Sequence, residues 1–268
     1  MDNKKILLIG DCCIDRFIYT NSTRFCPEAP VPVLDIVEQK ENLGMAGNVY
    51  ENLQSFNFDI EFIKPTNYTE HTKERIVDRS TNHMFLRIDN TVATDPINLD
   101  ALQRLDYSKY DAVVISDYCK GFVTEEAITL ISKLHEVTFL DTKKVLGRYA
   151  DRIAYIKINE SESKNNQEYI STNRLRESLI VTLGSKGCLY KGDIYSTEDV
   201  VVKDVSGAGD SFLTGLVYGI VRRKMGIAEA LGFANRVAGH AVRKRGVTVV
   251  RLEDVGYEDE KEAKEISC

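Results

Sequence analysis

The sequence predicts an α/β protein whose core is a mainly parallel sheet flanked by helices. Short apolar runs alternate along the chain with stretches of helical periodicity, and a glycine-rich turn precedes the clearest helix. Such alternation is typical of βαβ units and of a parallel sheet covered by helices. The chain has 268 residues, 43% of them hydrophobic, which suffices for one large α/β unit or two ordinary domains. The strand-like runs are residues 6–9, 60–63, 112–115, 137–140, 153–158 and 179–183.

Two segments interrupt this alternation, residues 17–37 and 72–89. Both mix alternating or β-branched residues with charges. This pattern predicts a small, partly exposed antiparallel sheet beside the main one. Because an isolated hairpin is marginally stable, we expect these two segments to form a small β-lid beside the main domain.

Helical periodicity is clearest from about residue 209 to residue 224, where apolar residues recur three and four positions apart and Gly226 can end the helix. A second apolar stripe begins near Ile227 and predicts another helix. Residues 253–265 are mostly charged, so we expect a solvated surface helix or tail there.

The composition excludes several classes of protein. The chain carries 35 Lys and Arg against 41 Asp and Glu, a net charge of −6, whereas a general nucleic-acid binder is usually basic. The apolar run at residues 6–10 is too short for a signal peptide or a membrane span. None of the six cysteines has the C-x-x-C spacing of a zinc or redox site. We therefore expect a cytoplasmic protein with free thiols and with no nucleic-acid or membrane partner.

Residues 200–212 are the most informative stretch: a strand-like run, a glycine turn and then the long helix. Small residues let backbone N–H groups approach an anion, and the helix N-terminus favours negative charge, so a phosphate fits here. The helix dipole stabilises the Asp210 carboxylate by roughly 0.3–1 kcal/mol and keeps it available to accept a proton. A plain tight turn with a favourable first-turn aspartate is the alternative. Phe212 replaces the third glycine of a dinucleotide fingerprint, which disfavours a nicotinamide site.

The stretch Asp-Val-Ser-Gly-Ala-Gly-Asp at residues 204–210 resembles the C-terminal signature of the ribokinase-like, or PfkB, carbohydrate kinases. Residues 44–48, 159–162 and 182–187 resemble, in the same order, that family's sugar site, N-x-x-E element and nucleotide-binding turn. The resemblance implies a ribokinase-like fold with a β-lid, and ATP-dependent transfer of the γ-phosphoryl group to a sugar hydroxyl.

Within this family the sequence is most similar to heptose 7-phosphate kinases of lipopolysaccharide precursor synthesis. The residues that carry this likeness are 10–11, 15–16, Arg24, 27–33, 86–89, 116–118, 120–121, Asp141 and Lys143. The resemblance leaves two alternatives open: a kinase for another sugar or sugar phosphate, and a non-catalytic sugar- or nucleotide-binding protein of the same fold.

The resemblance also implies roles for individual residues. Asp210 is the expected base, and the backbone of Gly207, Ala208 and Gly209 is the expected anion hole. The expected substrate-binding residues are Asp15, Gly44, Asn48, Arg87, Lys120, Asp141 and Lys143, of which Arg87, Lys120 and Lys143 are candidates to hold a substrate phosphate. The expected nucleotide-binding residues are Asn159, Glu162, Thr182, Gly184, Gly187 and Asn235.

The resemblance to the family also implies sites for metal ions. Asn159 and Glu162 are expected to serve Mg²⁺ through water, although Asn followed by Glu three residues later is also a helix-capping pattern. Asp204 is the candidate for a K⁺ ion beside the anion hole, and it is equally a turn residue. Residues 182–187 alone describe an ordinary turn, and Asn235 alone a solvated helix residue.

Three departures from the family pattern stand out. Residues 64–71 are shorter than the corresponding segment of relatives, and Gly44-Met45 replaces a more usual glycine pair. The sequence also shows no appended nucleotidyltransferase, so we expect no such second activity. Lids of this family often pair between two subunits, which predicts a homodimer with a small-molecule sugar as its substrate.

Overall fold

The computed structural model describes residues 4–172 and 174–257. Its largest element is an eight-stranded sheet with the order β12-β11-β10-β9-β8-β7-β1-β4. The strands from β4 to β10 pair in parallel, and the β10-β11 and β11-β12 pairs are antiparallel. The bounds are β1 Lys5–Gly10, β4 Asp59–Ile63, β7 Ala112–Asp117, β8 Thr138–Thr142, β9 Tyr155–Asn159, β10 Leu179–Thr182, β11 Cys188–Tyr190 and β12 Asp193–Tyr195. The predicted α/β fold is confirmed.

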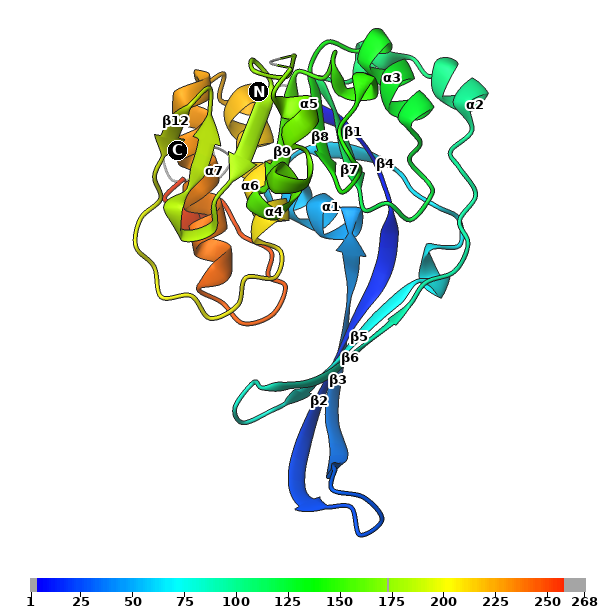
Figure 1. The fold of residues 1–268 in the computed structure, drawn as a ribbon, viewed down its shortest axis with the longest axis vertical. Coiled ribbons are helices and arrows are strands. Elements are labelled where there is room, and N and C mark those ends of the chain that lie inside the picture. Colours follow the sequence, from blue (N-terminus) through cyan, green and yellow to red (C-terminus); the bar gives the residue numbers. More distant parts are fainter. Residues whose placement is uncertain (1–3, 173, 258–268) are drawn as a thin grey trace, which may run out of the picture.

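Helices cover both faces of this sheet (Figure 1). In β1, Ile6 and Leu8 belong to one buried cluster, while Leu7 and Ile9 belong to the other. Successive side chains of a strand point to opposite faces, so an apolar run in β1 indicates burial on both sides. Helices α1, α6 and α7 contribute to the first cluster, and α2 and α3 to the second. The bounds are α1 Ala46–Ser55, α2 Leu99–Gln103, α3 Glu125–Leu134, α4 Glu160–Asn165, α5 Gln167–Ile170, α6 Ala208–Val217 and α7 Ile227–Val242.

The two helices near the C-terminus form as expected. α6 continues as a π-helical turn over Tyr218–Arg222, and α7 begins at Ile227. They pack closely because Gly215 has no side chain: a Cβ there would lie 2.8 Å from the Cα of Ala234.

Two local predictions differ from the structure. Residues 200–202 form an irregular loop and no strand, because they lie beside no partner strand and Val201 is 80% exposed. The loop is fixed instead by the N–H groups of Lys203 and Asp204, which donate to the carbonyl of Val242. In the predicted segment 253–265 the structure has a short 3-10 helix at Glu253–Val255, and residues 258–265 lie outside the described part.

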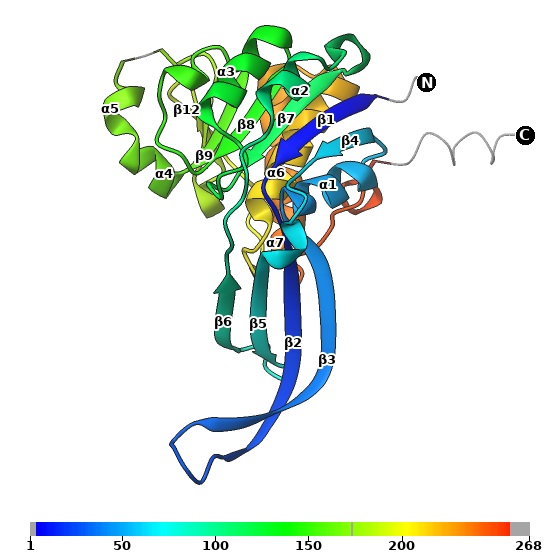
Figure 2. The ribbon, with the colours of Figure 1, turned by 90° about the vertical axis from the view of Figure 1, so that its right-hand side faces the viewer.

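The second sheet has four strands in the order β3-β2-β5-β6. It projects from the large sheet as a long arm, which we call the lid (Figure 2). Its strands are β2 Cys12–Phe25, β3 Pro32–Met45, β5 Thr72–Asp78 and β6 Met84–Asn90. The two hairpins are antiparallel, as predicted, but β2 and β5 pair in parallel. β2 follows β1 and β5 follows β4, and since β1 and β4 are parallel, the two lid strands leave the large sheet in the same direction.

Two departures noted in the sequence lie where the sheets join. Residues 64–71 contain one 3-10 turn, Tyr68–Glu70, so β4 leads almost directly into the lid. Met45 ends β3 with φ 58°, in the region that glycine favours, and α1 begins at the next residue. No helix in the described part of the chain is long and apolar enough to cross a membrane.

Gly10, at the end of β1, shows how closely the chain is packed where the two sheets join. A Cβ on Gly10 would lie 2.2 Å from the Ser116 carbonyl oxygen and 2.6 Å from the Ala46 Cβ. We predict that Gly10→Ala lowers the free energy of unfolding by about 1–3 kcal/mol, the usual cost of overpacking, in urea unfolding. Gly232→Ala is the control, because beyond the backbone of α7 itself and the two neighbouring residues no atom of the described residues lies within 4 Å of its Cβ position, and it should stabilise by about 0.5–1 kcal/mol. Equal unfolding midpoints for the two variants would contradict this.

Candidate active site

The residues of the expected anion hole, 207–209, lie at the start of α6. Gly207 has φ 80°, and a Cβ there would also lie 3.0 Å from Asn48 Nδ2. A Cβ on Gly209 would lie 2.7 Å from Lys157 Nζ. N–H groups of a first helical turn have no acceptor within the helix. The two glycines therefore give this turn its geometry and leave space for the side chains around it.

Asp210 lies in this turn with its side chain buried. Its Oδ2 accepts a hydrogen bond from Asn48 Nδ2 at 2.6 Å, and its Oδ1 accepts one from the Tyr118 hydroxyl at 2.9 Å. Burial and the charge of Asp141 raise the pKa of Asp210, while these two hydrogen bonds and Lys157 oppose the rise. A carboxylate with a raised pKa accepts a proton more readily, as a general base must.

Both donors are held in place by further hydrogen bonds. Asn52 Nδ2 donates to Asn48 Oδ1 at 3.1 Å, which turns the Asn48 amide nitrogen toward Asp210. Asn52 Oδ1 accepts from the Val250 N–H, and so connects α1 to the C-terminal part of the chain. The buried Asp11 carboxylate accepts from the Tyr118 N–H at 2.7 Å and fixes the loop that carries this tyrosine.

The expected sugar residues Asp15 and Gly44 meet where the lid joins the large sheet. Asp15 forms a buried ion pair with Arg75 on β5. Gly44 is required by space, because a Cβ there would lie 2.7 Å from Cys13 Sγ and 3.1 Å from the Asp15 Cβ. These contacts place Asp15 and Gly44 together at the base of the lid.

Positive charge gathers on the same side. Lys73 and Lys143 lie over the Tyr118 ring, 5.2 and 5.6 Å from its centroid. Burial lowers the pKa of Lys73, and the charges acting on this lysine include Arg87 and Lys120, two of the residues expected to hold a phosphate. Arg87 is half exposed and donates to Asp89 at 2.6 and 2.7 Å. Cations from the lid and from the loops after β7 and β8 thus gather around Tyr118 and Lys73.

Asp141 and Lys143, both at the end of β8, have partners that the sequence did not indicate. The buried Asp141 carboxylate pairs with Lys157 Nζ at 2.7 Å. Lys143 pairs with Glu162, so the structure places it on the nucleotide side as well as over Tyr118. The two residues connect the sugar and nucleotide halves of the site.

Asn159 and Glu162 form a complete capping box at the start of α4. Asn159 Oδ1 accepts from the Glu162 N–H at 2.8 Å, and Glu162 Oε2 accepts from the Asn159 N–H at 2.7 Å. The other Glu162 oxygen accepts from Lys143. With both carboxylate oxygens engaged, Glu162 fits contact with a hydrated Mg²⁺ ion through water better than direct ligation. Within the described residues no cluster of three His, Cys, Asp or Glu side chains is arranged to hold a metal.

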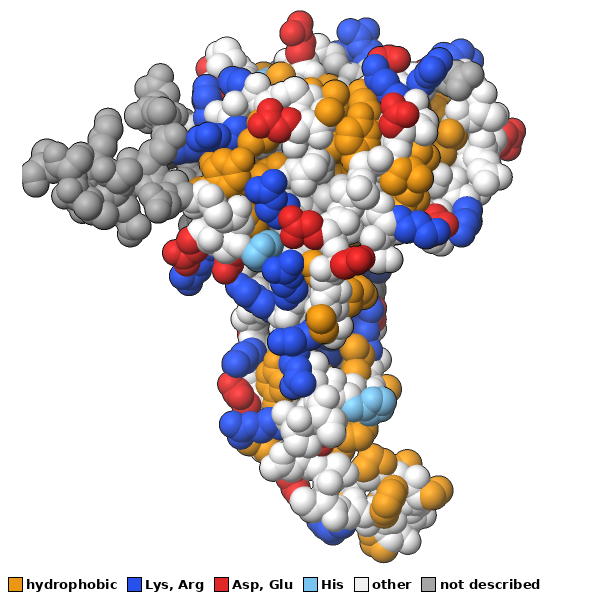
Figure 3. Space-filling view, turned by 90° about the vertical axis from the view of Figure 1, so that its left-hand side faces the viewer, with side chains coloured by type: hydrophobic (Ala, Val, Ile, Leu, Met, Phe, Trp, Pro, Cys, Tyr) orange, Lys and Arg blue, Asp and Glu red, His pale blue; other side chains and the backbone are white. Residues whose placement is uncertain are grey.

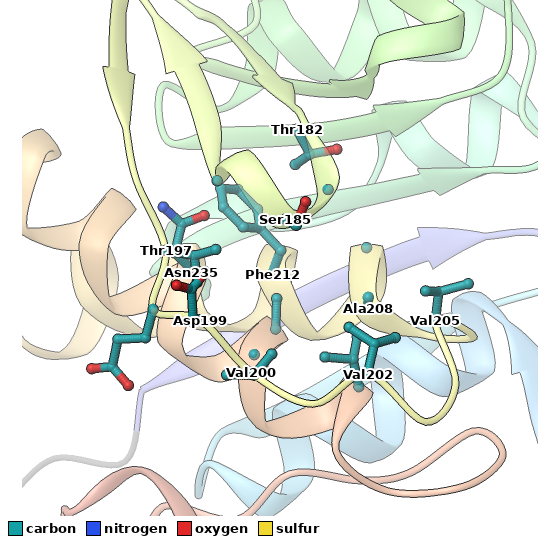
Figure 4. A pocket seen from close by; sticks show the side chains of 17 residues that line it. Thr182, Ser185, Thr197, Asp199, Val200, Val202, Val205, Ala208, Phe212 and Asn235 are labelled. Atoms are coloured by element: carbon teal, nitrogen blue, oxygen red, sulfur yellow. The ribbon is translucent and has the colours of Figure 1, made fainter.

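A cavity of about 220 Å³ lies between the loop after β10, the 197–205 loop and helices α6 and α7 (Figure 4). The expected nucleotide residues Thr182, Gly184, Gly187 and Asn235 all line it, as do Ala208 and Gly209 of the anion hole. Asn235 is buried, and its Nδ2 donates to the Tyr195 carbonyl oxygen at 2.7 Å, so it is not a solvated helix residue. The cavity is mostly apolar and reaches Ala208 and Gly209, the residues just before Asp210, which suits a base and ribose followed by phosphates.

Gly187 shows why the turn after β10 needs glycine. It has φ 89°, and a Cβ there would lie 2.0 Å from the Tyr195 carbonyl oxygen. Asp204, the candidate K⁺ residue, accepts from the N–H groups of Ser206 at 2.9 Å and Gly246 at 3.0 Å. It joins the two loops beside the anion hole, and its role toward K⁺ stays a prediction.

The sequence analysis assigned no role to Arg75, Tyr118 or Lys157, although Tyr118 lies in the segment 116–118 that resembles heptose kinases. A lysine inside the apolar run 153–158 is a signal, because a charged side chain in a strand buried on both faces requires a partner. Arg75 and Tyr118 carry no such local signal. Their partners Asp15 and Asp210 lie 60 and 92 residues away in the chain.

An apolar cavity beside the glycine-rich start of a helix, with a buried carboxylate in the first turn, fits a phosphoryl-transfer enzyme on a ribokinase-like fold. The sequence profile described as "pfkB family carbohydrate kinase" matches residues 45–254. The chain belongs to this family, and it is a sugar kinase.

Similar proteins agree with this assignment. The bifunctional protein HldE of Helicobacter pylori strain J99 is 28% identical to the chain, and that of a Nitratiruptor species is 29% identical; each alignment covers 94% of this chain. The chain spans 65% and 64% of the length of these two relatives.

Solved structures share the fold. Ribokinase from Thermotoga maritima superposes with a TM-score of 0.69 at 17% identity, covering 93% of this chain and 97% of that one. Phosphofructokinase-2 from Escherichia coli, in complex with potassium, gives a TM-score of 0.68 at 15% identity over 100% of both chains.

The raised pKa of Asp210 predicts a stability effect. The folded state binds the proton of the Asp210 carboxyl group more tightly than the unfolded chain does. Ionisation of Asp210 therefore costs nothing below the ordinary pKa of aspartate, and it lowers the free energy of unfolding as the pH rises from that value through the raised pKa of the folded state. We expect Asp210→Asn, which can keep one bond to Asn48 and one to Tyr118, to melt a few degrees above the parent at about pH 8, with the difference vanishing near about pH 4. Thermal unfolding across this range checks it, and a variant that melts below the parent at about pH 8 would contradict the prediction.

Proposed function

We propose that this protein is an ATP-dependent cytoplasmic kinase for a heptose 7-phosphate, with residues 1–268 acting as one kinase domain. The observation that carries the proposal is the juxtaposition of the buried base Asp210 with a cation-rich lid base, since a substrate that already bears a phosphate needs positive charge beside its hydroxyl. The HldE relatives support the choice of a heptose. A kinase for another sugar phosphate is the alternative.

The chemistry follows from the arrangement of this chain's groups. The substrate hydroxyl oxygen bonds to the γ-phosphorus of ATP, the bond from that phosphorus to the bridging oxygen breaks, and ADP leaves. Asp210 takes the hydroxyl proton, while Asn48 and Tyr118 hold its carboxylate in one orientation. N–H groups at the start of α6 face the negative charge of the transferred group. Mg²⁺ neutralises phosphate charge when ATP is bound, and Asn159 and Glu162 are the residues proposed to meet its waters.

The substrate proposal is tested by ADP release over a panel of heptose, hexose and pentose phosphates and the free sugars. We expect the highest kcat/KM with a heptose 7-phosphate and a large loss when its phosphate is removed. A preference for a pentose or hexose phosphate would overturn the heptose assignment and leave the kinase intact.

With the preferred sugar, Asp210→Asn should lower kcat by about 10²–10⁴-fold, the usual contribution of a positioned general base. Its stability is measured in the same preparation. Asp111→Asn is the matched control, because Asp111 pairs with Lys4 at the opposite end of the strands and should keep normal turnover. Near-normal turnover of Asp210→Asn would remove Asp210 from the role of base.

Glu162→Gln tests the metal role separately from capping. Glutamine at this position of a capping box still reaches back to the N-cap backbone, so the fold is preserved while the charge is lost. We expect the Mg²⁺ concentration for half-maximal activity to rise about 10-fold, as for loss of a group that supports a metal through its ligands, with little change in melting temperature. Superimposable Mg²⁺ titrations with a lowered melting temperature would leave capping as its role.

We further propose that two subunits pair through their lids. Figure 3 shows hydrophobic side chains gathered at the far end of the lid. The exposed apolar residues on the lid are Phe25, Val31, Ile36, Val37, Met84, Leu86 and Ile88. A second lid would bury these side chains and pair the open edges of the sheet.

Light scattering tests the dimer. We expect the parent protein to be dimeric and Leu86→Lys/Ile88→Lys to be monomeric, with reduced turnover because the lid no longer closes over the sugar. Ile194→Lys, on the outermost strand of the large sheet, changes a similarly exposed residue and should remain dimeric. A monomeric, fully active parent would defeat the proposal. Absence of sugar-dependent hydrogen-exchange protection in 17–37 and 72–89 would defeat closure of the lid.

A further inference from the structure

Lys157 is a buried lysine in the middle of the large sheet. It lies on β9 directly opposite Asp141 of β8, and the two side chains are only 5% and 4% exposed. Lysine is almost never this buried unless it is paired. Removing two charges from water usually costs more than their attraction returns, so such a pair is poor evidence for a stabilising device. Its position therefore needs another explanation.

The ammonium group lies against the anion hole. A Cβ on Gly209 would be 2.7 Å from Lys157 Nζ, and Gly209 and Ala208 line the nucleotide cavity. Asp210 is the next residue, and Lys157 is among the charges that act on its carboxylate. Glycine at position 209 thus leaves the space that the ammonium group occupies, beside a residue that lines the cavity and precedes Asp210.

The hydrogen bonding of this pair is incomplete. An ammonium group has three N–H donors, and among the described residues Lys157 Nζ has one hydrogen-bond acceptor, Asp141 Oδ2. Asp141 Oδ1 is buried without a partner in the same part of the structure. The pair therefore retains donors on the lysine and is held in one orientation by the aspartate.

We propose that Lys157 is a catalytic residue that donates to the transferred phosphoryl group, and that Asp141 is the positioning residue that holds it there. A fixed cation in a site without water stabilises charge on phosphoryl oxygens during transfer and needs no reorganisation as the reaction proceeds. This inference rests on the sugar kinase activity and is independent of which sugar is used.

The first test is Lys157→Met, with Lys144→Met as the matched control. Lys144 also pairs with a buried aspartate, Asp117, at 2.8 and 2.9 Å, and neither residue is among the charges that act on Asp210. The probe is tetrafluoroaluminate with MgADP, which mimics the transferred group and needs no sugar. We expect Lys157→Met to bind MgADP as the parent does but to capture tetrafluoroaluminate about 10²-fold more weakly. Lys144→Met should bind both normally, and equal capture by all three proteins would overturn the proposal.

The second test separates catalysis from folding. Lys157→Met leaves the Asp141 carboxylate buried and unpaired, which is destabilising, so the double variant Lys157→Met/Asp141→Asn removes that charge as well. We expect the double variant to recover the parent's melting temperature while its kcat stays about 10²-fold low. Recovery of kcat together with stability would show that the pair is structural and would overturn the proposal.

The pH dependence of kcat supplies a third readout. The groups that face Asp210 are Asn48 from α1, Tyr118 after β7, Asp141 and Lys143 at the end of β8, and Lys157 from β9. Without Lys157 the Asp141 charge is no longer offset, so the acidic limb of the profile should move to higher pH in the single variant. In the double variant the acidic limb should move back toward its position in the parent, because the Asp141 charge is gone. An unmoved limb in the single variant would contradict the placement of Lys157 beside Asp210.

These measurements distinguish failure of this inference from failure of the substrate proposal. If heptose 7-phosphate is not accepted, tetrafluoroaluminate capture still tests Lys157, and the best substrate of the panel replaces the heptose in the kinetic assays. If heptose 7-phosphate is accepted and Lys157→Met turns over normally, only the role of Lys157 fails.

Discussion

A buried carboxylate at the start of α6 is the group on which the rest of this structure depends. Asp210 can be buried there only because Asn48 and Tyr118 donate to its two oxygens, since an unsatisfied buried acceptor is costly. Each donor is fixed in turn, Asn48 by Asn52 and the loop of Tyr118 by Asp11. The hydrogen bonds around the Asp210 side chain thus connect β1, α1, β7, α6 and the C-terminal part of the chain. They hold the buried Asp210 carboxylate in a single position.

Beside Asp210, acidic and basic side chains alternate near the carboxyl ends of the parallel strands. Asp141 pairs with Lys157, and Lys143 pairs with Glu162, which caps α4. Neighbouring strands hold these side chains on a rigid framework, and this favours catalysis because the charges are in place before the substrate binds. The cavity reaches Gly209, and the Lys157 ammonium group lies beside this glycine, so the apolar walls and the charged surroundings of the first turn of α6 suit different parts of one ligand.

The lid follows from the same topology. Because β1 and β4 are parallel, the strands that continue from them leave the sheet together and pair side by side, and the ion pair between Asp15 and Arg75 joins them at the base. β3 then returns straight into α1 and places Asn48 beside Asp210. The lid and Asp210 are therefore connected through α1.

The sequence by itself determined the parallel strands, the α6–α7 pair, the lid segments and the glycine turn before Asp210, because apolar periodicity and glycine requirements are local properties. Local pattern failed at residues 200–202, where apolar residues have strand character but no neighbouring strand to pair with. It also gave no sign that β2 and β5 are parallel, which follows from the direction of two other strands. Only the tertiary structure decided which polar side chains meet. The contacts between distant segments are Arg75 with Asp15, Tyr118 with Asp210 and Lys157 with Asp141. The order of strands in the sheets brings these partners together, and no single stretch of sequence encodes that order.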